Sequence, residues 1–337
     1  MAFREVSVKS ARLAVAAFVV LMSWSSSGSA NPHRESVTFS SLRGNDGKPP
    51  AVIPAELYVP ADRAGPFAAV VLVHGSGGVA DFREHWYARE FAARGFAALV
   101  IDSFKPRGVT STVDDQTRVT TSQMILDAYA ALAFLATDKR IDPARIGVMG
   151  FSKGGTVALW SAMKAVGDRA EASGGTKQRF AFHLPFYPGC NFQYRSPATT
   201  GGPILMMLGE LDDYTQPQTC IDYAKRLQAG GVKVEYQVVP GAYHAWETES
   251  GPHYLARAER VRRCEYLIEG DGRYTWVKDK DGNPVTPVTL APKDVVEHSR
   301  SECRNYGPKV GGGNAEMKRK ALAEAFGFLE RHGLMRP

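Results

Sequence analysis

Residues 146–166 read IGVMGFSKGGTVALWSAMKAV, the most informative part of the sequence. It begins with an apolar run typical of a buried strand and ends, over residues 156–166, with the composition of a helix. Between them lies Gly150-Phe151-Ser152-Lys153-Gly154, which has the form G-x-S-x-G. In a strand-turn-helix setting this motif exposes a serine hydroxyl on a sharp turn. Side chains at positions 150 and 154 would collide with neighbouring backbone there. The competing interpretation is that Ser152 only caps the helix.

The alternation of apolar runs and amphipathic stretches continues on both sides of this motif. Strands are expected at residues 70–73, 96–101, 146–149, 180–186, 204–208 and 234–239, and helices at 86–94, 121–136, 156–166, 220–229 and 315–331. Nearly all-apolar strands that alternate with helices predict an α/β fold, with a doubly wound, mostly parallel sheet and helices on both faces.

An acid and a histidine follow two of the later strands. A serine attacks a carbonyl only when a base removes its proton, and a carboxylate has to orient that base. Asp212 and Asp213 come after strand 204–208, and His244 comes after strand 234–239. Because the carboxyl ends of parallel strands meet at one edge, we expect Ser152, Asp212 and His244 to lie together, with Asp213 as the alternative acid. The alternative without a catalytic role is that the two acids lie in a solvated turn and that His244 is an ordinary loop residue.

The loop His74-Gly75-Ser76-Gly77-Gly78 follows strand 70–73. Such a loop supplies one backbone N–H to an oxyanion, and the residue after the nucleophile, Lys153, supplies the other. We assign the first donor to Ser76, with Gly77 as the alternative.

The same loop fits a rival interpretation from another enzyme class. Gly75, Gly77 and Ala80 match G-x-G-x-x-A, and Asp102 lies 22 residues beyond Ala80, which is the pattern of a dinucleotide-binding oxidoreductase. That interpretation leaves the serine turn, the acid loop and the histidine loop without a role.

Charge and histidine spacing exclude other classes. The chain carries 41 Lys+Arg against 35 Asp+Glu, a formal charge of +6, and has no basic cluster interleaved with aromatic residues, so nucleic-acid binding is not expected. It has no H-E-x-x-H motif and no paired histidines at metal-ligand spacing, so no metal or other cofactor is expected. His183 lies within strand 180–186 and is interpreted as a hydrogen-bonded core residue. His253 and His298 fall in a polar region after the last strand.

The first thirty residues do not follow the alternation of strands and helices. Residues 1–30 carry basic residues, then the apolar run 13–22, then small residues up to Ala30, which is the layout of a secretory signal. The run is about half the roughly twenty residues that a membrane span needs. We therefore expect a secreted or periplasmic protein without a membrane span after cleavage.

Residues 31–337 are expected to form one domain. Residues 247–313, with a hairpin around 279–283, are expected to be an insertion before the last helix.

In this order the motifs resemble the dienelactone hydrolase-like branch of the α/β-hydrolases. The resemblance covers about residues 50–247 and the last helix, and it rests on His74-Gly75-Ser76-Gly77-Gly78, Asp102-Ser103-Phe104, Asp142-Pro143-Ala144-Arg145-Ile146, Gly150-Phe151-Ser152-Lys153-Gly154-Gly155, the aspartate loop and Gly241-Ala242-Tyr243-His244. It implies an α/β-hydrolase fold and hydrolysis of a small-molecule ester or lactone through an acyl-enzyme.

The resemblance has a limit and leaves alternatives. Dienelactone hydrolases proper carry cysteine as the nucleophile, whereas this chain carries Ser152, so dienelactone itself is not carried over as substrate. The alternatives are a prolyl oligopeptidase-like peptidase and a catalytically inactive secreted binding protein of the same fold. The sequence carries no signal for an oligomeric state.

Side chains near these loops are candidates for binding the substrate. The aromatic residues Phe151, Tyr187, Tyr214 and Trp246 flank the loops and are expected to line an apolar pocket. Arg107 is a candidate for binding a substrate carboxylate.

Four cysteines are more than a chain of this length needs for stability, and four allow three pairings. Cys190 and Cys220 both lie near the carboxyl edge of the expected sheet, and Cys264 and Cys303 bracket most of the insertion. We therefore expect the pairs Cys190–Cys220 and Cys264–Cys303. The second pair closes a loop of about forty residues, for which chain entropy gives roughly 4 kcal/mol.

Overall fold

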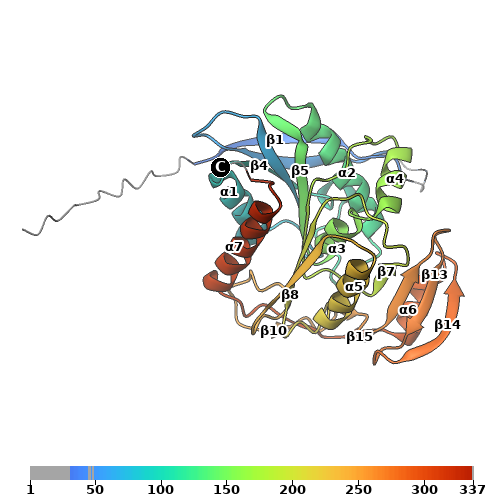
Figure 1. Cartoon of the computed structure of the whole chain (residues 1–337). Helices are drawn as coiled ribbons and strands as arrows, with labels where there is room; N and C mark the ends of the chain where they lie inside the picture. Colours follow the sequence, from blue (N-terminus) through green and yellow to red (C-terminus); the bar gives the residue numbers. More distant parts are fainter. Residues whose placement is uncertain (1–30, 45–46, 48, 336–337) are drawn as a thin grey trace, which may run out of the picture.

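The structure is a computed structural model that describes residues 31–44, 47 and 49–335. The expected secretory signal, residues 1–30, lies outside the described residues. Eight strands form the central sheet in the order β1-β2-β4-β3-β5-β6-β8-β9 (Figure 1). Their bounds are β1 His33–Ser40, β2 Val52–Val59, β3 Phe67–Val73, β4 Phe96–Ile101, β5 Ile141–Phe151, β6 His183–Phe186, β8 Ile204–Gly209 and β9 Val234–Val239.

The sheet is parallel from β4 to β9, and β1 and β2 add an antiparallel edge. Strand β3 pairs with β4 on one side and β5 on the other, and every residue of β3 is buried. This is the pattern expected for a strand covered on both faces. The α/β-hydrolase fold predicted from the sequence is confirmed.

Helices cover both faces of the sheet. They are α1 Trp86–Ala93, α2 Thr121–Thr137, α3 Lys153–Trp160, α4 Lys164–Ala172, α5 Pro217–Ala229 and α7 Ala315–Arg331. One core cluster joins the sheet to α2, α3, α4 and α5, and a second joins its other face to α1 and α7. Figure 1 shows α1 beside α7, although the two helices are far apart in the sequence.

The expected helix over residues 156–166 is instead two helices, α3 and α4, and α3 begins at once after Ser152. The break follows from tertiary contacts. Met163 bridges to Thr199, Thr200 N–H donates to the Ala162 carbonyl oxygen, and Lys164 N–H donates to Ala198. Backbone groups that bond to a neighbouring segment are lost to a continuous helix.

Residues 247–313 form small sheets and one helix. Strands β12 Glu265–Ile268, β13 Tyr274–Lys278 and β14 Pro284–Leu290 join β7 Phe192–Tyr194 of the preceding chain in a four-stranded sheet, and β13 and β14 form the expected hairpin. Two short pairs, β10 His253–Tyr254 with β16 Lys309–Val310 and β11 Glu259–Arg260 with β15 Asn305–Tyr306, and helix α6 Val295–Glu302 complete the region. Over the described residues, no helix is both long and apolar enough to cross a membrane.

Two disulfides are present, with the pairing expected from the sequence. Cys190 is bonded to Cys220, and Cys264 is bonded to Cys303. All four half-cystines are buried. The first bond joins the loop after β6 to α5, and the second joins the residue before β12 to the residue after α6.

Candidate active site

Ser152 occupies the turn between β5 and α3, with φ 54° and ψ −114°. A positive φ is rare for a residue with a side chain and indicates a constrained turn. The turn closes so tightly that a Cβ on Gly150 would lie 2.0 Å from the Gly154 carbonyl oxygen, and one on Gly154 would lie 2.1 Å from that of Val73. The requirement for glycine at both positions is therefore steric.

His244 and Asp212 complete a hydrogen-bonded chain that starts at Ser152. His244 Nε2 lies 2.8 Å from Ser152 Oγ, and its Nδ1 lies 2.8 Å from Asp212 Oδ2. A carboxylate only accepts hydrogen bonds, so the proton of a neutral imidazole resides on Nδ1, and Nε2 is free to accept the serine hydroxyl proton. Asp212 and His244 are each only 3 % exposed.

Backbone geometry separates the two neighbouring acids. Asp212 Oδ1 accepts the N–H groups of Tyr214, at 2.9 Å, and Thr215, at 2.8 Å, which fixes the carboxylate toward the imidazole. Asp213 instead pairs with the Arg260 guanidinium and accepts the Lys309 N–H at 2.8 Å. Of the two candidate acids, Asp212 is the one that contacts His244.

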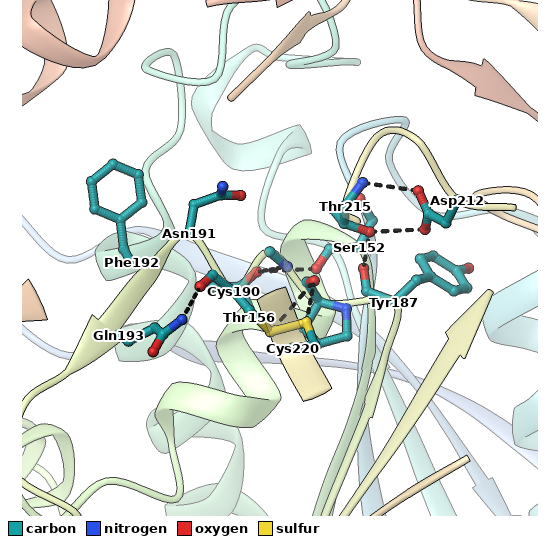
Figure 2. Close-up of a disulfide and its surroundings, with 12 residues drawn as sticks. Ser152, Thr156, Tyr187, Cys190, Asn191, Phe192, Gln193, Asp212, Thr215 and Cys220 are labelled. Atoms are coloured by element: carbon teal, nitrogen blue, oxygen red, sulfur yellow. Dashed lines mark hydrogen bonds between the residues drawn. A yellow bond between two sulfur atoms is a disulfide. The ribbon is translucent and has the colours of Figure 1, made fainter. Parts of the chain in front are cut away.

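Thr215 is a site residue that the sequence reasoning missed. Its hydroxyl lies 2.9 Å from Asp212 Oδ2, 3.1 Å from His244 Nδ1 and 3.1 Å from the Tyr187 carbonyl oxygen. Figure 2 shows this hydroxyl between Asp212 and Tyr187. A threonine three residues after an acid is a common local pattern, so nothing in the sequence singled it out.

The Cys190–Cys220 disulfide supports the same region from behind. It joins the segment after Tyr187 to α5, the helix that follows Thr215, so it links the chain on either side of the Thr215–Tyr187 hydrogen bond covalently (Figure 2). Thr156, on the first turn of α3, accepts the Gly189 N–H at 2.8 Å and ties this segment to the nucleophile turn. The loops that carry Ser152 and Asp212 are thus joined through one cross-linked segment.

The glycine loop, residues 74–78, packs directly against the serine turn. A Cβ on Gly75 would lie 3.0 Å from the Phe151 carbonyl oxygen and 3.3 Å from Ser152 Cβ. Lys153 is the first residue of α3, so its N–H has no acceptor within the helix. The structure therefore brings together the two segments that were expected to supply N–H donors.

His74 fixes the orientation of the glycine loop. Its fully buried imidazole lies 2.8 Å from the Gly75 carbonyl oxygen at Nδ1 and accepts the Ser103 N–H at Nε2, 3.1 Å away. Because Nε2 accepts an N–H, the ring proton resides on Nδ1, which donates to Gly75, and burial lowers the pKa of His74 in the same sense. Because C=O and N–H point in opposite directions in a trans peptide, this bond to Gly75 directs the Ser76 N–H away from His74.

Three of the four aromatic residues expected to line a pocket are core residues. Phe151, Tyr187 and Trp246 are fully buried, and the Tyr187 and Trp246 rings pack 4.7 Å apart. Large rings contribute most of the buried area beneath such loops. The expectation that these three line a pocket is corrected.

The rings of Tyr187 and Tyr214 both contact His244, at centroid distances of 4.8 and 4.7 Å. Tyr187 donates its hydroxyl to Glu247 at 2.7 Å, and burial raises the pKa of that carboxyl. Tyr214 is only partly buried. It is therefore the expected aromatic residue that retains exposed surface beside the histidine.

Arg107 does not face a substrate, contrary to expectation. Its guanidinium makes two hydrogen bonds, of 2.7 and 2.9 Å, to the fully buried carboxylate of Asp127 on α2, and a third to the Ser103 carbonyl oxygen. A buried carboxylate needs such a partner, and this need accounts for the arginine.

His183 is a core residue, as expected, and it bonds to the Ala158 carbonyl oxygen at 3.0 Å. In the part of the chain that the structure describes, no cluster of His, Cys, Asp and Glu could hold a metal ion.

Comparison with protein families gives one assignment. The model of the Dienelactone hydrolase family matches residues 53–264, which is well over half of the chain and includes Ser152, Asp212 and His244.

Two curated relatives and one solved structure illustrate the similarity. The chain is 28% identical over 166 residues to Protein usf of Aquifex pyrophilus, covering 47% of this chain and 67% of the relative. It is 26% identical over 215 residues to a protein of Methylorubrum extorquens named for carboxymethylenebutenolidase activity, covering 61% and 72%. Apo esterase 2 of Thermogutta terrifontis superimposes with a TM-score of 0.48 at 19% identity, covering 64% of this chain and 87% of that one.

Proposed function

Because the chain belongs to the dienelactone hydrolase family and is a carboxylic ester hydrolase, we propose that Ser152, His244 and Asp212 are its catalytic triad. The observation that carries this proposal is the unbroken chain of contacts, 2.8 Å at each link, from the serine hydroxyl through the imidazole to the buried carboxylate. The substrate is a small-molecule ester or lactone. A serine on a constrained turn, beside a base and an oriented carboxylate, is the arrangement that acyl transfer requires.

In the first half of the reaction, Ser152 Oγ attacks the ester carbonyl carbon while its proton passes to His244 Nε2. The carbonyl oxygen becomes an oxyanion, and the imidazolium is stabilised by Asp212. Collapse of the tetrahedral intermediate breaks the C–O bond, and the proton on Nε2 goes to the leaving alkoxide oxygen. With a lactone, that oxygen stays attached to the acyl group.

In the second half, water takes the place of the alcohol. His244 Nε2 removes a proton from the water as it attacks the acyl-enzyme carbonyl, and it returns that proton to Ser152 Oγ when the acid leaves. The backbone N–H groups of Lys153 and Ser76, with Gly77 as the alternative to Ser76, hold the oxyanion in both halves. Lys153 N–H also lies at the positive end of the α3 dipole.

The setting of the enzyme is also a proposal. The secretory layout of residues 1–30 and two buried disulfides support a secreted or periplasmic protein. Residues 31–337 are then one hydrolase domain, with residues 247–313 inserted between the histidine loop and α7. The contact of Arg260 with Asp213 supports a place for this insertion at the rim of the site.

The decisive experiment is labelling of the full-length protein with a fluorophosphonate, followed by intact mass and peptide mapping. The expected result is one added phosphonyl group on Ser152, none on Ser152→Ala, and turnover of short-chain, aromatic or lactone esters. No mass increase, under conditions in which a control esterase labels fully, would identify an inactive binding protein. Labelling with turnover of peptides but of no ester would favour the peptidase.

A further inference from the structure

A short segment, residues 111–116, holds the glycine loop by the residue that we propose as an oxyanion donor. The Ser76 carbonyl oxygen accepts the Thr112 N–H at 2.8 Å and the Ser111 hydroxyl at 3.2 Å. The Ser76 hydroxyl donates to Gln116 Oε1 at 3.0 Å. Fixing the Ser76 carbonyl also fixes the N–H of Gly77, which belongs to the same peptide unit. Backbone and side chain of Ser76 are therefore both bonded to segment 111–116.

The same segment holds the other proposed donor, Lys153. The Lys153 ammonium donates to the Gln116 carbonyl oxygen at 2.8 Å and to Thr112 Oγ1 at 3.4 Å. Burial lowers the pKa of this ammonium to about 8. A buried cation with only neutral acceptors is costly, so these bonds constrain its position strongly.

Gln116 is the residue at which these contacts meet. Its Oε1 accepts from Ser76 and Thr112, its carbonyl oxygen accepts from Lys153, and its Nε2 donates to the Tyr214 hydroxyl at 3.4 Å. The Tyr214 ring in turn packs on His244. One side chain thus touches the glycine loop and the acid loop, and its backbone touches the residue after the nucleophile.

We infer that Gln116 is a positioning residue for the reaction: its side chain sets the placement of the glycine-loop donor relative to Ser152 and steadies the tyrosine against His244. This inference rests on the proposed function. The donors have to lie 2.7–3.1 Å from the place that the oxyanion will occupy, so small shifts in either loop reduce the stabilisation of the transition state. The substrate itself need not touch Gln116.

Segment 111–116 does not depend on the Gln116 side chain for its place in the fold. Arg257 pairs with Asp114 at 2.8 Å, and Arg300 pairs with Asp115 at 3.4 Å, so residues 247–313 anchor the segment from outside. The Lys153 bond uses the backbone of residue 116 and survives substitution. Replacement of the side chain therefore removes the Ser76 and Tyr214 contacts while the segment stays attached.

The test compares Gln116→Met with Gln228→Met in the full-length enzyme. Gln228 makes a single side-chain bond, to the Val234 carbonyl oxygen at 2.8 Å, on α5 and away from these loops. For hydrolysis of a short-chain aryl ester, Gln116→Met is expected to lower kcat by roughly 10- to 100-fold with KM changed less than about threefold, because only the transition state carries the oxyanion. Gln228→Met is expected to keep the wild-type kcat, and the two thermal midpoints should be similar.

A double-mutant comparison shows whether Gln116 acts through Ser76. Ser76→Ala removes the hydroxyl but keeps the N–H, so Ser76→Ala combined with Gln116→Met is expected to be no slower than Gln116→Met alone. Fully multiplicative losses would place the two residues in separate roles and overturn the inference, as would an unchanged kcat or a rise in KM alone. If wild type labels with fluorophosphonate while Gln116→Met matches its kcat, only the inference fails. If wild type neither labels nor hydrolyses esters, the proposed function fails, and the inference fails with it.

Discussion

The hydroxyl oxygen of Thr215 lies 3.1 Å from Nδ1 of His244, within reach of the hydrogen bond that this ring makes to Asp212. The Asp212 carboxylate and the Thr215 hydroxyl thus both lie within hydrogen-bond distance of Nδ1 of the imidazole. The hydroxyl has a single proton, which it gives to Asp212 or to the Tyr187 carbonyl oxygen. The orientation of the base thus depends on two loops, the acid loop and the segment that carries Tyr187.

Thr215→Val keeps the shape of the side chain and removes the hydroxyl. We expect kcat to fall by roughly 10- to 100-fold, with KM nearly unchanged, because one hydrogen bond to a charged group is worth about 1.5–3 kcal/mol. Thr137→Val, which removes a bond to the Phe134 carbonyl oxygen far from the triad, serves as the control. Steady-state kinetics that show equal kcat for the two variants would exclude a role for Thr215.

The two neighbouring acids should differ sharply when each is made neutral. Asp212→Asn is expected to lower kcat by about 10³- to 10⁴-fold, since the amide favours the wrong imidazole tautomer. Asp213→Asn, which weakens only the Arg260 and Lys309 contacts, should stay within a few-fold of wild type. Kinetics on the two purified variants, with circular dichroism to check folding, measure this difference. A reversed order would move the triad acid to Asp213.

Arg107→Leu should act on stability and not on substrate affinity. It leaves the fully buried Asp127 carboxylate with only the Ser41 hydroxyl as a partner, which is expected to cost about 3–5 kcal/mol of the free energy of unfolding. Chemical denaturation measures this loss. Adding Asp127→Leu should restore part of it, because no buried charge is then left alone. A large rise in KM confined to esters that carry a carboxylate would instead show that Arg107 binds the substrate carboxylate.

His183 makes stability depend on pH on the acid side. Burial lowers its pKa from 6.5 in the unfolded chain to about 4 in the fold, so the unfolded state binds the proton more tightly. The contribution of His183 is fully present above pH 6.5 and is lost as pH falls toward 4, with a total on the order of 3 kcal/mol. His183→Gln should flatten this part of the profile, and the exposed His253→Gln should not. Denaturation at several pH values provides the comparison.

Much of the site could be predicted because the sheet dictates it. Residues that follow buried parallel strands have to emerge at one edge, so Ser152, Asp212 and His244 could be grouped from strand patterns alone. Residues on irregular loops could not be grouped in this way. Gln116 lies in a segment with no periodicity, and its partners Ser76, Lys153 and Tyr214 come from two loops and the start of α3.

The errors have a common physical origin in pairing across the fold. Arg107 is a candidate for binding a substrate carboxylate by sequence, but its partner, Asp127, lies on the next helix and is buried. Phe151, Tyr187 and Trp246 flank the triad in the sequence, but their side chains point into the core. The expected helix over residues 156–166 breaks because residues 162–164 bond to a distant segment. Propensity and neighbourhood along the chain carry no information about such partners.

At Ser152, the residue type that best fits the backbone differs from the residue type that the proposed reaction needs. At φ 54° and ψ −114° a side chain is strained by about 1–3 kcal/mol, and glycine would adopt the same angles without strain. Selection for a more robust protein alone would thus favour glycine at the one position where the proposed chemistry needs a hydroxyl. The proposed chemistry thus accounts for a serine at a turn whose backbone angles favour glycine.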